Sequence, residues 1–333
     1  MRAWVVRELG PPGNMHLEDL PLGAAPRDKV RVNVKAAGIN FFDSLVVAGT
    51  YQSKPELPFI PGAEVAGTVV YAPPGSGFVE GDRVMARLKP DGIQGGGYAE
   101  TAHADPDHTV KIPQSMSFEH AAALFITYQT GWFGLHRRAE LQSGEFLLVH
   151  AGAGGVGSAA IQLGKAAGAI VIATAGSPEK VRLCEELGAD HAINYKTDDF
   201  VEAVKDFTKG HGADVIYDPV GGDVFDRSTK CIAFEGRLVV VGFTSGQFPQ
   251  ARANHVLIKN YSVVGLHWGL YDERRRDLVA QCTDELLRLS QEGRIRPFVT
   301  RRVPLEQANV ALLDVATGRS SGKSVLLPEM EPS

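Results

Sequence analysis

A hydrophobic segment that leads directly into a glycine-rich turn constrains the fold of this chain more than any other feature. Residues 146–150 (FLLVH) run into the sequence AGAGGVG, in which Gly152, Gly154 and Gly157 fit the pattern GxGxxG. A strand before the turn and a helix after it form the context in which this pattern binds a dinucleotide. Glycine permits the tight turn and lets backbone N–H groups approach a pyrophosphate, which the start of a helix also attracts. The candidate contacts are Gly152, Gly154, Gly155, Val156 and Gly157, and a plain strand-to-helix turn is the alternative.

Strands and amphipathic helices alternate along the chain from residue 146 onward. The expected strands are 146–150, 170–174, 191–194, 214–218, 236–241 and 261–266, and the helices between them are 155–167, 178–187, 199–208 and 224–233. Such alternation requires a doubly wound parallel sheet that is covered on both faces. We therefore expect residues 119–287 to form a Rossmann domain that binds the dinucleotide.

The segments outside this region have a different sequence pattern. Residues 1–118 contain short β-rich runs, such as 29–36 and 63–71, that are separated by glycine and proline. These runs indicate a barrel or sandwich. Residues 288–333 are too few for a third domain, and we expect them to pack on residues 1–118. A long helix over 273–292 is expected to lead into this tail. The predicted class is α/β, with a β-rich domain beside the Rossmann domain.

The residues after the second strand of the series indicate which dinucleotide is bound. An NAD site places Asp or Glu about 20 residues after the glycine loop, on the ribose hydroxyls. This chain has ATAGS at 173–177, without a carboxylate, and then Ser177 and Lys180 at the next helix start. A hydroxyl and an ammonium group suit a 2′-phosphate, and Tyr195 could reach the same pocket. We therefore predict NADPH as the cofactor, with Glu179 pointing outward. The alternative makes Ser177 a plain helix cap and Lys180 a solvated side chain.

Composition excludes several classes of partner. The chain has 333 residues and a net charge of −5, with acidic and basic residues mixed throughout, so neither nucleic acid nor a membrane surface is expected. No secretory leader is visible, and the longest apolar runs are far shorter than the roughly 20 residues that cross a bilayer. The three cysteines are widely separated, which favours reduced thiols and a cytoplasmic location.

Six short motifs in order resemble the medium-chain dehydrogenase/reductase superfamily, within it the zinc-independent quinone oxidoreductase branch that includes zeta-crystallin. These motifs are AGIN at 37–40 followed by Asp43, GTY at 49–51, PGAEVAG at 61–67, EGDRV at 80–84, GYAE at 97–100, and the glycine loop at 151–157. The resemblance covers essentially the whole chain. It implies a GroES-like catalytic domain made of residues 1–118 and 288–333, and an active site in the cleft beside the Rossmann domain. It also implies a homodimer or homotetramer, often joined through Rossmann edge strands.

Zinc-dependent relatives hold their catalytic metal with Cys, His and Cys, and the resemblance matches these positions to Asn40, Ala63 and Ile126. These three residues do not form a workable ligand set for zinc. The structural zinc lobe of those relatives needs four clustered cysteines, and residues 90–97 (PDGIQGGG) contain none. We therefore expect no metal.

The same resemblance implies roles for individual residues. Asn40 and Tyr51 face the nicotinamide, Asn40 as a hydrogen-bond donor and Tyr51 either as a proton donor or as a packing residue. The residues implied to lie near the nicotinamide or to wall the acceptor pocket are Thr127, Val241, Gly242, Phe243, Leu266, Trp268 and Lys323. Without a Lewis acid, positioning and hydrogen bonds must make hydride transfer fast. The predicted acceptor is therefore a small molecule that takes hydride readily, a quinone or an α,β-unsaturated carbonyl compound.

Two alternatives remain open at this stage. An enoyl-thioester (acyl-CoA) reductase would need a groove for a pantetheine arm, and residues 274–276 (RRR) are a basic run that could meet a CoA phosphate. That run is also consistent with a solvated helix face. The second alternative is a protein that binds NADPH with little turnover, as lens crystallins of this branch do. Asn40 and Tyr51 favour an enzyme, while the physiological acceptor and the choice between dimer and tetramer stay open.

Overall fold

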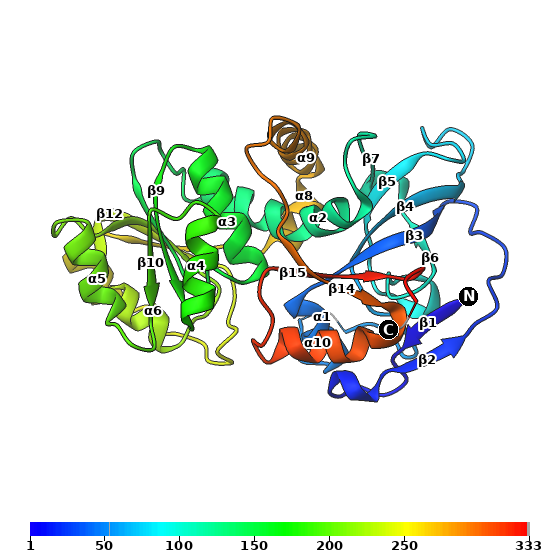
Figure 1. The fold of residues 1–333 in the computed structure, drawn as a ribbon, viewed down its shortest axis with the longest axis horizontal. Helices are drawn as coiled ribbons and strands as arrows, with labels where there is room; N and C mark the ends of the chain where they lie inside the picture. The colour runs from blue at the N-terminus through cyan, green and yellow to red at the C-terminus, as the bar shows by residue number, and fades with distance from the viewer. Residues whose placement is uncertain (53, 332–333) are drawn as a thin grey trace. The chain divides into compact units, whose positions relative to one another are not determined.

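The chain folds into two compact units, which are described separately. The computed structural model describes residues 1–52 and 54–331. The N-terminal unit comprises residues 1–126 and 297–333, and the nucleotide unit comprises residues 127–296 (Figure 1). The sequence analysis placed the domain boundaries at 118/119 and 287/288, somewhat earlier in the chain at both points. One reason is that helix α2 (Phe118–Trp132) begins in the N-terminal unit, where the backbone N–H of Ile126 donates to Glu64.

The N-terminal unit is built around a seven-stranded sheet with the order β14-β15-β3-β4-β5-β7, to which β6 adds by pairing with β3. Its strands are β3 (Val30–Ile39), β4 (Glu64–Tyr71), β5 (Arg83–Arg87), β6 (Thr101–Ala104), β7 (Thr109–Lys111), β14 (Val299–Pro304) and β15 (Lys323–Leu327). Neighbours are antiparallel except for the parallel pair β14–β15. Strand β3 buries Val30, Val32 and Val34 at alternate positions, the period that places every second side chain on one face. Strands β1 (Arg2–Val5) and β2 (His16–Asp19) form a separate antiparallel pair.

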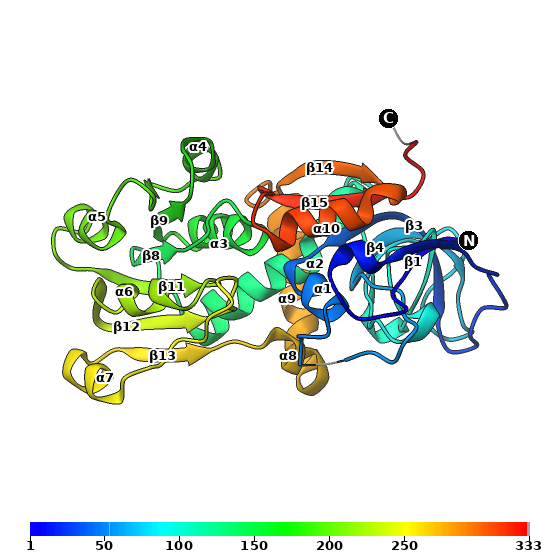
Figure 2. The same ribbon diagram turned by 90° about the horizontal axis from the view of Figure 1, so that it is seen from below.

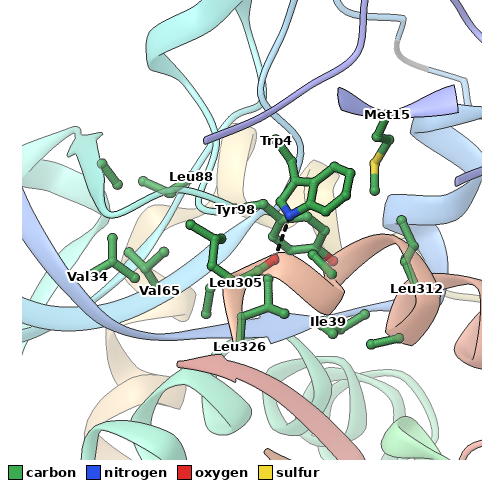
Figure 3. Close-up of a cluster of buried hydrophobic side chains, with 14 of the residues drawn as sticks. Trp4, Met15, Val34, Ile39, Val65, Leu88, Tyr98, Leu305, Leu312 and Leu326 are labelled. Atoms are coloured by element: carbon green, nitrogen blue, oxygen red, sulfur yellow. Dashed lines mark hydrogen bonds between the residues drawn. The ribbon is translucent and has the colours of Figure 1, made fainter. Parts of the chain in front are cut away.

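A hydrophobic core joins both ends of the chain within this unit. Trp4 and Tyr98 pack with Leu305, Leu312 and Leu326 (Figure 3). The Trp4 indole N–H donates to the carbonyl oxygen of Leu305 over 2.6 Å, so the buried ring keeps a partner for its polar atom. Helices α1 (Phe41–Val47) and α10 (Ala308–Ala316) pack against each other, with 3-10 turns η1 (Pro12–Asn14), η2 (Gly92–Gln94), η3 (Pro106–His108) and η5 (Leu305–Gln307) in the connections. The C-terminal segment is therefore an integral part of the first core.

The nucleotide unit contains a six-stranded parallel sheet with the order β10-β9-β8-β11-β12-β13, most of which can be followed across Figure 2. The strands are β8 (Phe146–Val149), β9 (Ile170–Ala175), β10 (His191–Asn194), β11 (Ala213–Asp218), β12 (Ile232–Val240) and β13 (Ser262–Gly265). The helices are α3 (Gly155–Ala166), α4 (Pro178–Glu186), α5 (Phe200–Phe207), α6 (Asp223–Ser228), α7 (Ala253–Lys259), α8 (Trp268–Arg274) and α9 (Arg276–Gln291). A π-helical segment, η4 (Phe133–Arg138), continues α2. The strand order is that of a doubly wound sheet, and the predicted α/β class is confirmed.

Several elements differ from the sequence expectations. The helix expected over 224–233 ends at Ser228, and β12 begins at Ile232, which pairs with Ala213 of β11. A register shift follows within β12, where Glu235 adopts a left-handed backbone conformation (φ 59°). The long helix expected over 273–292 is divided at Arg275, whose φ of −142° and ψ of 58° are not helical. Helices α1 and α7 were not anticipated, since seven residues are too few to show a clear period. No helix among the described residues is long and apolar enough to cross a membrane.

Candidate functional site

Asn40 lies between the end of β3 and the first residue of α1. Its backbone N–H donates to the Asp43 carboxylate over 2.8 Å, and the Tyr98 hydroxyl donates to the same oxygen over 2.9 Å. A carboxylate in the first turn of a helix satisfies a backbone donor there and suits the helix dipole. The buried Asp43 side chain therefore fixes the backbone of Asn40.

The side chain of Asn40 belongs to a buried polar network with Glu64 and Lys323. The Lys323 ammonium donates to Asn40 Oδ1 over 2.5 Å and to Glu64 Oε1 over 2.6 Å. Asn40 Nδ2 donates to the same Glu64 oxygen over 2.9 Å, while Glu64 Oε2 accepts the backbone N–H of Ile126 over 2.9 Å. Glu64 is fully buried and Lys323 is 4% exposed. Each charge is thus paired and hydrogen-bonded, the condition under which charges are tolerated in an interior.

The backbone beside this network admits only glycine. A Cβ atom at Gly38 would lie 2.3 Å from Glu64 Oε1 and 2.4 Å from the carbonyl oxygen of Ala122. The second contact is with backbone and could not be relieved by a rotamer change. Gly38 is therefore what allows Glu64 to lie against β3, between that strand and the start of α2.

Asp43 combines deep burial with an acidic group. Burial raises the pKa of Asp43 to about 7, although the hydrogen bonds from Asn40 and Tyr98 oppose the rise. An aspartate in an unfolded chain has a pKa of about 3.9. Between these two values the folded state binds the proton more tightly than the unfolded state. Ionisation of Asp43 should therefore reduce stability as the pH rises from about 4 to about 7.

Replacing Asp43 by asparagine should remove this pH dependence. From about pH 4 to about pH 8, the free energy of unfolding of the wild type should fall relative to that of Asp43→Asn by about 4 kcal/mol. Urea unfolding followed by circular dichroism at several pH values measures the difference. The exposed substitution Asp28→Asn serves as the control and should leave the profile unchanged. Parallel pH profiles for the wild type and Asp43→Asn would show that Asp43 ionises normally in the folded protein.

The glycine-rich turn connects β8 to α3 in the nucleotide unit. A Cβ atom at Gly157 would lie 2.2 Å from the carbonyl oxygen of Ala151, and one at Gly152 would lie 2.9 Å from Cys184 Sγ. These two glycines therefore permit the tight turn and the close packing of helix on strand. Gly154 precedes α3 without a side-chain cap. The first N–H groups of the helix, at Gly155, Val156 and Gly157, have no acceptor within it, so the turn fits a bound pyrophosphate.

His150 lies between β8 and this turn and is buried. Its two ring nitrogens lie 3.0 Å from Thr174 Oγ1 and 2.8 Å from Ser228 Oγ. Burial lowers the pKa of His150 to about 3, so the ring is neutral at physiological pH. His150 therefore links β9 and α6 beneath the turn as a structural residue.

The residues predicted for the adenosine end lie together after β9 and β10. Ser177 is the cap of α4 and its hydroxyl accepts the backbone N–H of Lys180 over 3.3 Å. A Cβ atom on Gly176 would lie 2.6 Å from the Tyr195 hydroxyl, which places the phenol beside this turn. Burial, followed by the positive charge of Lys196, lowers the pKa of Lys180. Two ammonium groups therefore share this region.

Glu179 was the residue least consistent with a phosphate site. It is largely exposed and its carboxylate lies 3.8 Å from the Arg182 guanidinium. The carboxylate is thus partly balanced within α4 by the next turn of the helix. This placement agrees with the outward orientation that the sequence analysis expected for Glu179.

Further predicted residues follow β12 and β13 in the nucleotide unit. Val241, Gly242 and Phe243 directly follow β12, and the Val241 N–H donates to the carbonyl oxygen of Asp218 over 2.9 Å. Leu266 is buried directly after β13. Because the strands are parallel, these segments lie at the carboxyl edge of the sheet, where open α/β sheets bind ligands.

Trp268 is hydrogen-bonded to a buried residue of the same unit, and Thr127 is itself buried. The Trp268 indole N–H donates to Gln129 Oε1 over 3.0 Å, and Gln129 Nε2 donates to Thr283 Oγ1 over 3.0 Å. Gln129 is fully buried, and Thr127, two residues earlier on α2, is 4% exposed. The network fixes the tryptophan ring at the start of α8.

Tyr51 follows the end of α1 in the N-terminal unit. Its ring centre lies 5.5 Å from that of Phe42 at an angle of 50°, and the ring packs against the core around Trp4. Burial raises the pKa of Tyr51, with the positive charge of Arg87 acting in the opposite direction. The hydroxyl therefore keeps its proton at neutral pH, as either predicted role requires.

Comparison with known proteins agrees with both units. Residues 26–114 match the alcohol dehydrogenase GroES-like domain, and residues 155–284 match the family described as zinc-binding dehydrogenase. A quinone oxidoreductase-like protein 2 homolog from Nematostella vectensis is 40% identical, over 98% of this chain and 88% of its own length. Among solved structures, a probable oxidoreductase from Mycobacterium abscessus is 37% identical with a TM-score of 0.89, covering 98% of this chain and 99% of its own. Escherichia coli quinone oxidoreductase, in a complex with NADPH, is 30% identical with a TM-score of 0.90, covering 98% of this chain and all of its own.

The chain belongs to the quinone oxidoreductase-like branch of the medium-chain dehydrogenase/reductase superfamily. The resemblance that the sequence motifs indicated is thereby confirmed, as is the combination of a GroES-like domain with a Rossmann-type sheet.

This member of the quinone oxidoreductase-like branch lacks the donor set for a catalytic zinc. Asn40 is engaged by Glu64 and Lys323, and the other two matched positions are the apolar Ala63 and Ile126. The Lys323 ammonium group is itself a cation, and it already pairs with the Glu64 carboxylate that could otherwise attract a metal ion. Among residues 1–52 and 54–331, no three His, Cys, Asp or Glu side chains are grouped as a metal site would require. The residues present do not fit zinc.

The sequence analysis missed several residues that surround the predicted site. Glu64 and Asp43 were recognised as parts of motifs without a role, and their contact with Asn40 depends on folding that a linear pattern does not show. Lys196 directly follows Tyr195, and this adjacency was the available signal. Asn40, Tyr51 and Lys323 belong to the N-terminal unit, and all other predicted site residues belong to the nucleotide unit.

Proposed function

We propose that this protein is an NADPH-dependent, zinc-independent reductase that transfers hydride to quinones or α,β-unsaturated carbonyl compounds. The observation that carries the proposal is the sheet edge of the nucleotide unit, where the glycine turn is followed by two lysines and no carboxylate at the end of β9. When bound, NADPH would supply the hydride. The relationship to Escherichia coli quinone oxidoreductase, solved with NADPH, supports the same cofactor.

The adenosine end favours a 2′-phosphate over free ribose hydroxyls. We propose that Lys180 binds this phosphate, with Ser177 and Tyr195 donating hydrogen bonds. The pKa of Lys180 is lowered first by burial and then by the positive charge of Lys196, so the two ammonium groups repel each other. A dianionic phosphate would relieve this repulsion, whereas the hydroxyls of NADH would not.

The pyrophosphate would be held by backbone groups and the nicotinamide end by side chains. We assign the pyrophosphate to the N–H groups of Gly155, Val156 and Gly157, in a turn shaped by Gly152 and Gly154. For the nicotinamide end and the acceptor pocket we propose seven of the residues that the resemblance implied, which are Asn40, Thr127, Val241, Gly242, Phe243, Leu266 and Trp268.

The acceptor follows from the absence of a zinc ligand set among the matched positions. Hydride that reaches a conjugated carbonyl compound leaves negative charge on the distant oxygen, which needs a hydrogen-bond donor and then a proton. We propose Asn40 as the donor and Tyr51 as the source of the proton. Tyr51 carries its proton because burial raises its pKa, and it lies on the segment that follows α1.

An acceptor screen tests the function and separates it from the alternatives. Purified protein is mixed with NADPH and, in turn, 9,10-phenanthrenequinone, 1,4-benzoquinone and crotonyl-CoA, and NADPH oxidation is followed at steady state. We expect oxidation with the quinones. A clear preference for crotonyl-CoA would identify an enoyl-thioester reductase. Tight NADPH binding without oxidation above background would support a non-catalytic NADPH-binding protein instead.

We propose that the protein is a homodimer joined through β13. This strand has one neighbour in the described sheet, and exposed apolar side chains lie close to it in the chain, with Leu257 77% and Ile258 75% exposed on α7. An unpaired edge strand beside apolar surface is suited to pairing with a second copy.

Charged residues on α7 should disrupt this assembly. Light scattering should give about 72 kDa for the wild type, twice the 35.8 kDa of one chain, and a tetramer would give twice that again. The double substitution Leu257→Asp/Ile258→Asp should shift the mass toward 35.8 kDa. Val310→Asp, at an exposed apolar position of the other unit, is the matched control. A wild type that already behaves as a monomer would exclude the dimer.

The three cysteines bear on location. Cys184, Cys231 and Cys282 are free and buried, as expected for thiols that stay reduced. We propose a cytoplasmic location, which fractionation of cells that express the protein would test. Recovery with membranes or outside the cell would contradict it.

A further inference from the structure

The orientation of the Asn40 amide follows from the chemistry of its two neighbours. An ammonium group can only donate hydrogen bonds, and an ionised carboxylate can only accept them. The oxygen of the Asn40 amide must therefore face Lys323, and the nitrogen must face Glu64, as the distances of 2.5 Å and 2.9 Å show. Rotation of the amide by half a turn would set oxygen against carboxylate and nitrogen against ammonium.

This arrangement determines what Asn40 can offer to a ligand. The amide oxygen is engaged by Lys323 and one N–H by Glu64, and the second N–H is not used by either contact. Hydrogen bonding of a cation to an amide oxygen also polarises the group and strengthens its N–H as a donor. Asn40 is thus prepared to donate rather than to accept.

We propose that Lys323 and Glu64 are positioning residues that hold Asn40 as a hydrogen-bond donor, and that Lys323 acts on the reaction through Asn40 instead of contacting the dinucleotide. The kinetic part of this inference rests on the proposed function. It differs from the role that the sequence resemblance implied for Lys323, a direct place near the cofactor. Lys323 is only 4% exposed, and its ammonium already bonds two partners.

The key variant neutralises both partners together. Removing Lys323 alone would leave Glu64 as an unpaired buried charge, which is strongly destabilising. Glu64→Gln/Lys323→Met removes both charges and keeps similar side-chain volumes. The side-chain amide introduced at position 64 can present either oxygen or nitrogen, so it no longer dictates the orientation of Asn40. The matched control is Lys35→Met/Glu329→Gln, which neutralises an ion pair of the same unit in which Glu329 is 65% exposed.

Side-chain amide NMR gives a readout that is independent of turnover. In ¹⁵N-labelled protein, the Asn40 resonance is assigned by its loss in Asn40→Ala. In the wild type, the proton bonded to Glu64 should be shifted well downfield of its partner, and exchange between the two should be slow. The control pair should keep this separation, and Glu64→Gln/Lys323→Met should collapse it. An unchanged Asn40 resonance in that variant would overturn the proposal.

A double-mutant cycle provides the kinetic test. When Asn40 is intact, Glu64→Gln/Lys323→Met should lower kcat with 9,10-phenanthrenequinone by about 10-fold or more. The Kd of NADPH, measured by fluorescence, should change by less than about threefold. The control pair should stay within about twofold of the wild type. In the Asn40→Ala background, the same double substitution should add less than about threefold, because the residue through which it acts is gone.

The outcomes separate this proposal from the proposed function. Additive losses, or an NADPH Kd weakened about 10-fold in both backgrounds, would show that Lys323 contacts the dinucleotide and would overturn the proposal. A wild type that oxidises no NADPH would defeat the proposed function alone, and the NMR comparison would then decide. If Glu64→Gln/Lys323→Met does not fold, the single substitution Glu64→Gln takes its place, and it should shift the downfield side-chain proton of Asn40 upfield. An unmoved proton there would equally refute the inference.

Discussion

Replacing Lys180 by glutamate is expected to lower kcat/KM for NADPH by at least about 100-fold, while kcat/KM for NADH changes by less than about threefold. The substitution would remove the proposed charge-assisted hydrogen bond to the 2′-phosphate and set a carboxylate against this group. A 100-fold loss corresponds to about 2.7 kcal/mol, which is within the range of a single bond between charged groups. NADH lacks this phosphate and should scarcely sense the change.

Two further variants make this test specific. Lys196→Glu should weaken NADPH use in the same direction but less, since Lys196 acts on the region mainly through its charge. Lys230→Glu makes the same charge change at an exposed position of the nucleotide unit and should leave both cofactors unaffected. Steady-state rates with each cofactor and one quinone supply the comparison. Equal losses of kcat/KM with NADPH and NADH after Lys180→Glu would show that the 2′-phosphate does not bind in this region.

The second large effect is expected at Gly157. A methyl group there would lie 2.2 Å from the carbonyl oxygen of Ala151 and 2.8 Å from the Cα of Gly152, so the turn must open. We expect Gly157→Ala to weaken NADPH binding by about 30-fold or more, because displaced backbone N–H groups no longer converge on the pyrophosphate. Crowding of this kind also lowers the free energy of unfolding, by about 1–3 kcal/mol.

Two other glycines serve as controls for Gly157→Ala. A Cβ atom on Gly154 would meet only the Ala151 oxygen, at 3.2 Å, so Gly154→Ala should have a smaller effect on binding. A Cβ atom on Gly13 would meet nothing within 4 Å, and Gly13→Ala should bind NADPH normally. Fluorescence titration measures the Kd, and circular dichroism checks that each variant is folded. Wild-type affinity in folded Gly157→Ala would mean that the dinucleotide does not bind at this turn.

The parts of the fold that depend on local patterns could be predicted from the sequence. The strand at 146–150, the glycine turn and the following helix were placed within about one residue of β8 and α3, because hydrophobic periodicity and glycine positions are local signals. The α/β class and the family followed from the same signals and from six motifs. Helix α1 was missed because it is too short to show a period, and the early start of β12 was missed because it depends on pairing with β11.

The site was harder to predict than the fold because its contacts are distant in sequence. Asn40 and Lys323 were each named, but nothing in the chain indicated that their side chains touch across 283 positions. Glu64, which joins them, belongs to a motif that the sequence analysis used only to identify the family. A pattern of residues specifies which groups are present, while the pairing of donors and acceptors is decided by packing.

The position of the last strand has a consequence for how the protein is made. Trp4 and Leu305 share one core, and β15 with Lys323 pairs with β3 in the sheet, so the N-terminal unit stays unfinished until the ribosome has added β15 (Lys323–Leu327). Residues 127–296 form their unit from a continuous segment and can close earlier in synthesis. We therefore expect nascent chains that are arrested before residue 297 to resist protease in the middle and to be cut near the beginning. A chain that is shortened at its end would then bind a dinucleotide without being able to hold Asn40 in place.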